Sequence, residues 1–248
     1  MSELTLNKLD TRAPKDFDKS ETKDKTAGLL EELQELQNLL YAESKHSILV
    51  VLQGMDASGK DGLIRSVFGA LNPQGVTVKS FKVPTEEELG HDFLWRVHAA
   101  APAKGMIRIF NRSHYEDIVV TRVHKWIDDE TARKRIKAIN DFEQLLHTHN
   151  NTQILKFYLH VSKEEQKERL MERMKDPTKQ WKYNEKDFAE ADLRHEYAWA
   201  YEDCFTQCNV FPWTIVPSDQ NWYKEYLVAK KLRDTLTDLN MQYPGLKK

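Results

Sequence analysis

The stretch Ile48-Leu49-Val50-Val51-Leu52-Gln53-Gly54-Met55-Asp56-Ala57-Ser58-Gly59-Lys60-Asp61-Gly62 decides how the rest of the chain is arranged. Residues 48–52 form an unbroken apolar run rich in β-branched side chains, which is typical of a strand covered on both faces in a parallel sheet. Residues 54–60 have the spacing G-x-x-x-x-G-K. Glycines at these positions let backbone N–H groups turn inward onto an anion, and the helix that follows adds the positive end of its dipole. The stretch therefore predicts a buried strand, a phosphate-binding loop and a helix start.

Two carboxylates accompany this loop. Asp61 stands where a Ser or Thr hydroxyl commonly meets a magnesium ion, and Asp56 lies inside the loop itself. A carboxylate aimed at a phosphate is repulsive unless a cation or a basic residue lies between them. We therefore predict a metal-bridged phosphate site. The alternative is an ordinary glycine-bearing turn in which the two aspartates cap the helix.

Length and composition limit the class of protein. The chain has 248 residues, 31% of them charged, and a formal net charge of -2, so one large domain with a real core is expected. A general nucleic-acid or membrane-surface binder would be markedly basic, and neither partner is expected. No apolar run approaches the ~20 residues of a membrane span, and the N-terminus lacks a signal-like core, so we expect a cytoplasmic protein. Cys204 and Cys208 are too few for a disulfide framework or a zinc site.

The chain divides into an arm and a domain. Residues 1–25 are polar and interrupted by Pro14, so we expect an arm that lies on the body or on another subunit. From residue 26 leucines recur at helical spacing up to residue 43, which favours a helix packed on the domain over a dimer zipper. Residues 26–248 then form one α/β domain with a mainly parallel sheet. Its strands are expected at residues 48–52, 76–83, 105–110, 153–161 and 211–216, and its main helices at residues 62–71, 85–98, 118–126, 129–149 and 184–207.

The third expected strand delivers polar residues to the edge of the sheet where ligands bind in α/β proteins. It ends in Asn111-Arg112-Ser113-His114-Tyr115-Glu116-Asp117. Arg112 can clamp phosphoryl oxygens through its planar fork. Because Asn111 stands where an aspartate often reaches the metal, Glu116 is the candidate replacement carboxylate. The alternatives are that Ser113 caps a helix, that His114 is a packed core residue and that Glu116 complements a helix dipole.

A second basic region follows the fourth expected strand. Residues 169–182 hold five basic and two acidic side chains, a local charge of +3 in a chain whose total is -2. Asp176-Pro177 breaks the helix there. A helix, a proline break and a basic segment predict a hinged lid that closes over phosphates and excludes water. The alternative is a solvated loop whose lysines have no such role.

These parts suit phosphoryl transfer, in which positioning and charge neutralisation carry most of the catalysis. The chain offers no clear pair of nucleophile and base. A phosphate acceptor, already ionised at neutral pH, needs no general base, so a phosphate acceptor is favoured over a hydroxyl acceptor.

Three ordered blocks of the chain resemble the signature blocks of the polyphosphate kinase 2 family: residues 54–62, residues 111–117 and Lys175-Asp176-Pro177-Thr178-Lys179-Gln180-Trp181-Lys182. The resemblance runs from about Leu29 to the last helix. It implies a P-loop kinase-like (thymidylate-kinase-like) three-layer sandwich with a five-stranded, mainly parallel sheet and a helical lid at about residues 163–186. It also implies reversible transfer of a phosphoryl group between inorganic polyphosphate and nucleoside mono- and diphosphates, with Mg²⁺, or alternatively Mn²⁺, in a homo-oligomer (dimer or tetramer).

The resemblance also implies roles for individual residues. Many members have Asp-Arg-Ser-Trp-Tyr-Asn where this chain has Asn111 to Glu116, and the version here resembles the subgroup that acts on both AMP and ADP. The expected catalytic residues are Asp56, Lys60, Asp61, Arg112 and Glu116, of which Asp56, Asp61 and Glu116 are the expected metal ligands. Phosphate or polyphosphate binding is assigned to Gly54, Ala57, Ser58, Gly59, Lys60, Lys82, Arg112, Arg173, Lys175, Lys179 and Lys182, and nucleotide binding to Asp56, Asn111, Arg112, Glu116 and Arg122.

Two other functions compete with this one. An ATP-dependent nucleotide or small-molecule kinase would use the same fold, but Asp61 in place of Ser or Thr speaks against it. A non-catalytic nucleotide sensor or scaffold could use the arm and the leucine stripe. Such a regulator would not need Arg112, two loop carboxylates and a basic lid together.

Overall fold

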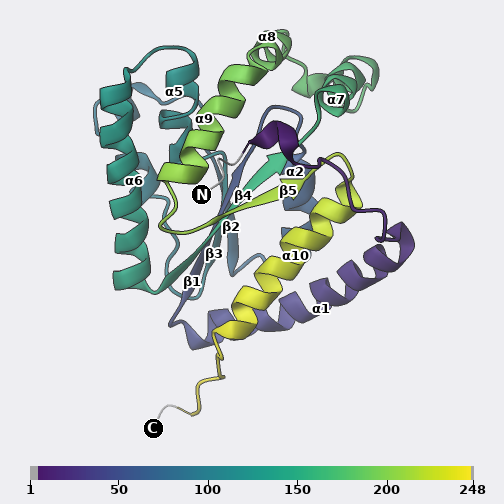
Figure 1. Ribbon diagram of the computed structural model, residues 1–248. Helices are drawn as coiled ribbons and strands as arrows, with labels where there is room; N and C mark the ends of the chain where they lie inside the picture. Colours follow the sequence, from purple (N-terminus) through teal and green to yellow (C-terminus); the bar gives the residue numbers. More distant parts are fainter. Residues whose placement is uncertain (1–4, 247–248) are drawn as a thin grey trace.

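The computed structural model describes residues 5–246, and its centre is a five-stranded sheet (Figure 1). The strand order is β2-β3-β1-β4-β5, and all four neighbouring pairs are parallel. All seven residues of the central strand β1 are buried, as the apolar run predicts. The prediction of an α/β fold with a mainly parallel sheet is confirmed. The strands are β1 (Ser47–Gln53), β2 (Val76–Ser80), β3 (Ile107–Asn111), β4 (Thr152–His160) and β5 (Trp213–Pro217).

Helices cover both faces of this sheet, which makes the three layers that the resemblance implies. In Figure 1, α6 (Asp129–Asn150) and α9 (Arg194–Gln207) lie on one side, and α1 (Lys19–Glu43) and α10 (Asn221–Asp238) on the other. Successive side chains of β1 enter opposite cores: Leu49 and Val51 pack in one cluster and Val50 in the other. Alternation of this kind is the period-2 geometry of a strand.

Helix α1 begins earlier than expected. Its N-cap is Asp18, whose side chain accepts hydrogen bonds from two backbone N–H groups, so the helix starts at Lys19 and the expected start at residue 26 was wrong. The last seven residues of the expected arm are therefore helical. The leucine stripe packs on the domain as predicted, with Leu29, Leu33 and Leu40 buried against the core.

The remaining part of the arm lies on the body. The N–H of Leu6 donates to Glu202 at 2.7 Å, and the Leu6 side chain is buried. The Thr11 hydroxyl donates to Asp219 at 2.8 Å. The expectation that the arm takes its structure from the body is confirmed for residues 5–18, and residues 1–4 lie outside the described part.

Several expected helices are shorter or divided. The capping box of Thr85 and Glu88 is present, but the helix it starts ends at Leu89 and a separate one follows. The expected helix at 184–207 is interrupted at Leu193, which has a ψ of 20°. The smaller helices are α2 (Lys60–Leu63), η2 (Ile64–Phe68), α3 (Glu86–Leu89), α4 (Trp95–His98), η3 (His114–Asp117), α5 (Val120–Val123), α7 (Lys163–Lys175), η4 (Gln180–Lys182) and α8 (Lys186–Asp192), with η1 (Leu6–Lys8) in the arm.

Two further expectations concern the whole chain. Cys204 and Cys208 are free and buried. Within residues 5–246 no helix is long and apolar enough to cross a bilayer.

Candidate phosphate-binding site

The loop between β1 and α2 has the backbone that its glycines predict. Gly54 has a φ of 145° and Gly59 a φ of 94°, a region that side chains disfavour. A Cβ atom at Gly54 would lie 2.9 Å from the carbonyl oxygen of Leu159. The predicted sequence of strand, tight loop and helix start is confirmed, and the N-terminus of α2 faces the loop.

Lys60 folds its ammonium group into this loop. Its Nζ donates to the carbonyl oxygens of Gly54 at 2.7 Å and Met55 at 3.1 Å, and the residue is 8% exposed. Burial lowers the pKa of Lys60 to about 8. An anion bound in the loop would favour the charged form and offer the ammonium a stronger partner.

Arg112 joins the ends of two strands. Its Nη2 donates to Asp56 in the loop, and its Nη1 donates to Glu116 at 3.1 Å. The charge of Glu116, and after it that of Asp56, raises the pKa of Arg112 against the opposing effect of burial. Arg112 has a φ of 61°, which is a strained backbone conformation for an arginine. Strained residues of this kind cluster at functional sites.

Hydrogen bonds of Ser113 fix the turn that carries Arg112 and Glu116. Ser113 caps η3 by accepting from the N–H of Tyr115 at 3.2 Å, so its predicted capping role is confirmed. Gln53, at the end of β1, donates to the Ser113 hydroxyl at 3.0 Å. His114 is fully buried, as the packed alternative predicted.

Asp61 forms a separate group with Asn111 and the lid. Asn111 Nδ2 donates to Asp61 at 2.9 Å and Lys182 Nζ donates at 2.7 Å. Burial alone would raise the pKa of Asp61, but these two hydrogen bonds lower it below its usual range. The N-cap of α2 is Gly59, without a side-chain capping bond, so neither Asp56 nor Asp61 caps the helix.

The three expected metal ligands offer suitable atoms but are divided between these groups. Asp56 and Glu116 share Arg112, whereas Asp61 pairs with Lys182. In the described part of the chain, no three His, Cys, Asp or Glu side chains come together as a metal site. Mg²⁺ prefers oxygen ligands and commonly takes only one or two carboxylates beside substrate phosphates and water. The donor set therefore fits a magnesium ion that is completed by its substrate.

A hollow beside the loop brings in residues that the sequence did not single out. Its lining includes Asp56, Arg112 and Glu116, and it also includes Gln166, Glu190, Tyr197 and Tyr201 from α7, α8 and α9. Tyr201 donates to Gln53 at 3.0 Å and Tyr197 to Glu190 at 2.5 Å. Tyr197 and Tyr201 lie four residues apart on α9, but nothing in their local sequence distinguishes this face from an ordinary core face.

Two expected binding residues lie elsewhere. Arg122 Nη1 donates to Asp203 at 2.5 Å, and its guanidinium lies 4.2 Å from the Trp199 ring centroid. These partners hold Arg122 against α9, outside the hollow's lining. Lys82 follows β2 and is exposed, and its carbonyl oxygen accepts a hydrogen bond from Arg96 Nη1 at 2.9 Å.

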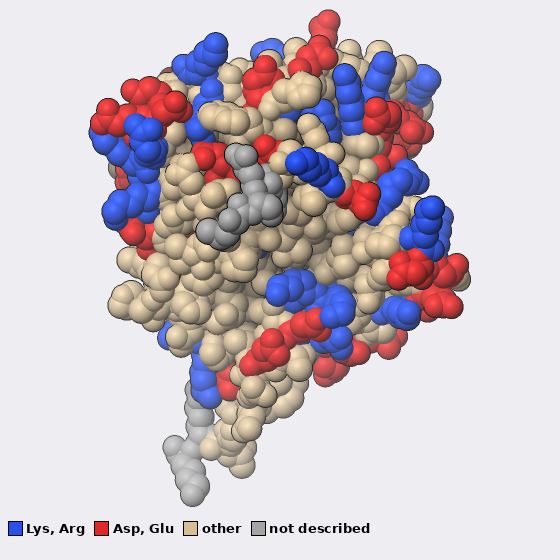
Figure 2. All heavy atoms as spheres, in the orientation of Figure 1, with Lys and Arg blue, Asp and Glu red and all other residues tan. Residues whose placement is uncertain are grey.

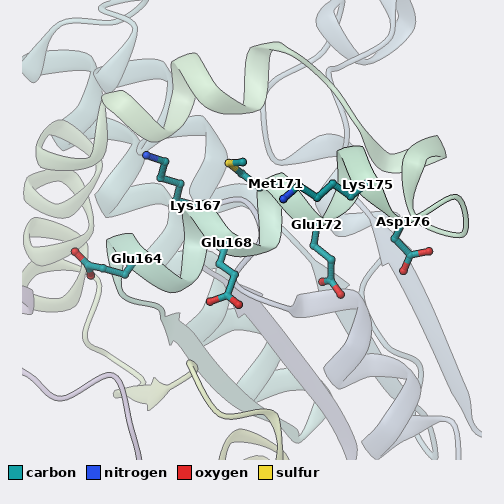
Figure 3. A pocket seen from close by; sticks show the side chains of 7 residues that line it. All are labelled: Glu164, Lys167, Glu168, Met171, Glu172, Lys175 and Asp176. Atoms are coloured by element: carbon teal, nitrogen blue, oxygen red, sulfur yellow. The ribbon is translucent and has the colours of Figure 1, made fainter.

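Three of the four expected lid cations are paired with carboxylates. Arg173 donates to Asp187 at 2.8 Å and Lys179 to Glu172 at 2.6 Å, so only Lys182 of the four reaches the loop. Lys175 lines an open hollow along α7, together with acidic side chains (Figure 3). On the face that Figure 2 shows, basic and acidic side chains are interspersed.

Comparisons with known proteins agree with this geometry. Residues 16–244 match the sequence model of Polyphosphate kinase 2 (PPK2). The chain is 50% identical over 214 residues, 86% of its length and 80% of the relative's, to an AMP/ADP-polyphosphate phosphotransferase of Meiothermus ruber. It is 41% identical over 229 residues, 87% of its length and 79% of the relative's, to an ADP-polyphosphate phosphotransferase of Rhodopseudomonas palustris. The crystal structure of Polyphosphate Kinase 2 from Arthrobacter aurescens TC1 superposes with a TM-score of 0.95 at 39% identity, covering 100% of this chain and 90% of that one.

Proposed function

The chain belongs to the polyphosphate kinase 2 family, and from that premise we propose that it transfers phosphoryl groups reversibly between inorganic polyphosphate and nucleotides. With polyphosphate as the donor, the reaction converts AMP to ADP and ADP to ATP. The observation that carries the proposal is the position of Arg112 between Asp56 and Glu116, beside a phosphate-binding loop. The name of the Meiothermus ruber relative supports both AMP and ADP as acceptors.

The residues of this site would act mainly by position and charge. The loop N–H groups, the start of α2 and Lys60 bind the phosphates of one substrate. Arg112 turns its planar fork from the carboxylates to the phosphoryl oxygens, and its charge neutralises the charge on the group in transfer. The acceptor oxygen belongs to a phosphate and is already ionised, so no side chain has to remove a proton.

A magnesium ion, or a manganese ion in its place, completes this proposal. Asp56, Asp61 and Glu116 would hold it, and Asn111 would orient Asp61. When bound, the ion neutralises phosphate oxygens that would otherwise repel these carboxylates. Support comes from the donor set alone.

The phosphates of the nucleotide would bind beside Arg112, where the hollow, of about 20 Å³, admits a nucleoside only if the helices that line it move apart. These phosphates would meet Asp56 through the metal, with Asn111, Arg112 and Glu116 nearby. Tyr197 and Glu190 line this hollow, and their mutual hydrogen bond would have to break for either side chain to contact the nucleoside. Arg122 would reach the nucleotide only by leaving Asp203, and Lys82 only by a movement of the segment after β2.

Polyphosphate would bind under a lid formed by residues 163–186. Arg173, Lys179 and Lys182 would exchange their carboxylate partners for the more highly charged polyphosphate, and Lys175 would add its charge from the same helix as Arg173. The rest of the proposal is a single domain with an N-terminal arm, whose boundary moves from residue 25 to residue 18 because α1 begins at Lys19, together with a homo-oligomer and a cytoplasmic location.

The deciding experiment supplies purified protein with Mg²⁺ and AMP, and with either polyphosphate or ATP as donor. Chromatography follows ADP and ATP, and Lys60→Ala is the control variant. Formation of ATP from AMP and polyphosphate, lost in Lys60→Ala, is the expected result. Turnover with ATP alone would instead favour an ATP-dependent kinase, and no turnover with either donor would favour the non-catalytic function.

A further inference from the structure

The carbonyl groups of four consecutive loop residues accept hydrogen bonds from side chains of two distant helices. Helix α7 supplies Gln166 and Arg169, and helix α10 supplies Lys224. The contacts are Gln166 Nε2 to the oxygen of Asp56 at 3.1 Å, Arg169 Nη1 to that of Ala57 at 3.1 Å, and Lys224 Nζ to those of Ser58 at 3.4 Å and Gly59 at 3.5 Å. These three side chains form what we call the carbonyl clamp.

The clamp determines where the N–H groups of the loop point. The structure has no cis peptide bond among its described residues, and in a planar trans peptide the C=O and the following N–H point in opposite directions. Each carbonyl oxygen held on the side of α7 and α10 therefore turns the next N–H away from these helices. The N–H of Ser58 donates to the Met55 carbonyl at 3.2 Å, so the N–H groups of Ala57 and Gly59 are the ones that the clamp directs toward an anion. Inward N–H groups are the ones that bind phosphate oxygens.

Lys224 is the unusual member of the clamp. It is 1% exposed, and Asn221 Oδ1 accepts from its Nζ at 2.9 Å. No carboxylate forms an ion pair with Lys224 among residues 5–246. Burying an ammonium group without a counter-charge costs free energy. An anion bound on the other side of the loop would supply the negative charge that no ion pair of the protein provides.

Gly59 lies directly over this ammonium. A Cβ atom at Gly59 would lie 2.3 Å from Lys224 Nζ and would displace this ammonium group, and the φ of 94° favours glycine independently. The other charged groups that face Lys224 are Arg169 and Glu165 of α7, Glu225 of α10 and Lys60 of α2. Arg169 is also held by contacts outside the loop, since its Nη2 donates to the carbonyl oxygens of Ser218 at 2.8 Å and Asp219 at 3.0 Å.

We propose that Lys224 is a positioning residue for phosphate binding: it holds the Ser58 and Gly59 carbonyls outward and places a positive charge behind the loop, so that the loop binds the phosphate chain of its substrate. Gln166 and Arg169 hold the two preceding carbonyls in the same way. The proposal deepens the proposed function and rests on it for the nature of the substrate, but its test requires only that the loop binds phosphates.

The test measures binding of inorganic tripolyphosphate by calorimetry at pH 6, where Lys224 is charged, without nucleotide, to the full chain and to Lys224→Met. Loss of one hydrogen-bonding charge predicts a dissociation constant that rises about tenfold. Lys230→Met is the matched control, because Lys230 is exposed on the same helix and pairs only with Asp234. Its dissociation constant should stay at the wild-type value. Thermal unfolding of each variant checks the fold.

Two milder variants keep the test decisive if Lys224→Met does not fold. Lys224→Gln keeps a hydrogen-bond donor without the charge, and Asn221→Ala removes the oxygen that orients Nζ. Both variants should weaken tripolyphosphate binding, and Asn221→Ala should have the smaller effect. In turnover assays both variants should raise the KM for polyphosphate more than they lower kcat. A merely structural role would lower the melting temperature and leave the dissociation constant of the folded fraction unchanged.

Wild-type affinity in Lys224→Gln and Asn221→Ala would overturn the inference, as would failure of the wild-type chain to bind tripolyphosphate. If tripolyphosphate binds and Lys224→Gln weakens it, but no ATP forms from AMP and polyphosphate, the inference stands and the proposed function fails.

Discussion

Arg112 Nη2 donates a hydrogen bond to Oδ1 of Asp56, so the residue that follows β3 is bound to the loop that follows β1. The same guanidinium holds Glu116 through its Nη1 at 3.1 Å. One cation thus serves two carboxylates whose side chains are 25% and 16% exposed. A phosphate group that takes over Arg112 leaves these carboxylates in need of another cation, which is the physical reason to expect a divalent metal with the substrate.

Replacing Arg112 with lysine should lower kcat/KM for polyphosphate-dependent ATP formation by about 100-fold or more. A lysine cannot present two parallel N–H groups to phosphoryl oxygens or hold Asp56 and Glu116 at once. Arg133→Lys, at an exposed position on α6, is the control and should keep wild-type activity. A less than fivefold loss in Arg112→Lys would show that the fork is not needed.

Replacing Glu116 with glutamine should weaken metal binding and slow the reaction far more than replacing Asn111 with alanine. Glu116 carries a charge that a divalent ion requires, whereas Asn111 is a neutral donor that positions Asp61. Activity measured against Mg²⁺ concentration gives the half-saturating concentration for each variant. Equal and mild effects of the two substitutions would contradict this assignment of the metal ligand.

Lys156→Met should destabilise the fold by about 3–5 kcal/mol, because the buried carboxylate of Glu143 loses its lysine partner and keeps only the Tyr115 hydroxyl and His114. Lys156 Nζ donates to Glu143 at 2.8 Å and to the hydroxyl of Tyr115 at 2.9 Å, and Lys156 and Glu143 are almost completely buried. Burial would raise the pKa of Glu143, but His114 and Lys156 lower it. Urea unfolding measures the loss.

The double variant Lys156→Met/Glu143→Leu should recover much of that stability, since it removes both charges. The exposed pair of Lys137 and Asp141 on α6 provides the control, and Lys137→Met should change little. A double variant as unstable as Lys156→Met would show that packing, rather than the unpaired charge, causes the loss.

Stability should rise with pH above about 7 because of Lys224. Burial lowers its pKa from 10.5 to about 7, helped by Arg169 and Lys60 and opposed by Glu225 and Glu165. Between those values the unfolded chain binds more protons than the folded one, so the free energy of unfolding rises with pH, by up to about 1.4 kcal/mol per pH unit. Below pH 7 both states are protonated and the penalty of burial is complete.

Lys224→Met isolates this contribution, because Lys60 and the other titrating groups are common to both proteins. The free energy of unfolding of the wild type minus that of Lys224→Met, from urea curves at pH 6, 8 and 9.5, should be lowest at pH 6 and increase at each step. A difference that does not change with pH would show that Lys224 has an ordinary pKa.

The sequence predicts the parts of this site that depend on local patterns. An apolar run followed by G-x-x-x-x-G-K specifies β1, the loop and α2, and the position of Arg112 after a strand places it at the same edge of the sheet. The expected helix start at residue 26 was wrong because Asp18 caps α1 eight residues earlier, a signal that the leucine spacing does not contain.

Contacts between distant segments were beyond prediction. Gln166, Arg169 and Lys224 reach the loop from 110, 112 and 166 residues away. Nothing near Lys224 in the sequence distinguishes it from the exposed lysines of the same helix. Arg122 was expected at the nucleotide, and its engagement by Asp203 and Trp199 requires α9 to pack against α5. These relationships arise only when the sheet has brought its helices together.

Tripolyphosphate should protect the segment between Lys175 and Lys182 from trypsin. The pair of Lys182 and Asp61 is 2.7 Å long, with Asp61 60% and Lys182 32% exposed, and such a pair contributes only about 0–1 kcal/mol. A polyanion in the loop offers Lys182 several charges in place of one, and it offers Lys179 the same exchange against Glu172. The lid should therefore be held more firmly with the ligand than without it. Mass spectrometry of timed digests locates the cuts, and Lys182→Gln, which loses this attraction, should show weaker protection at Lys175 and Lys179. Equal cleavage rates with and without tripolyphosphate would mean that residues 175–182 are a solvated loop and not a lid.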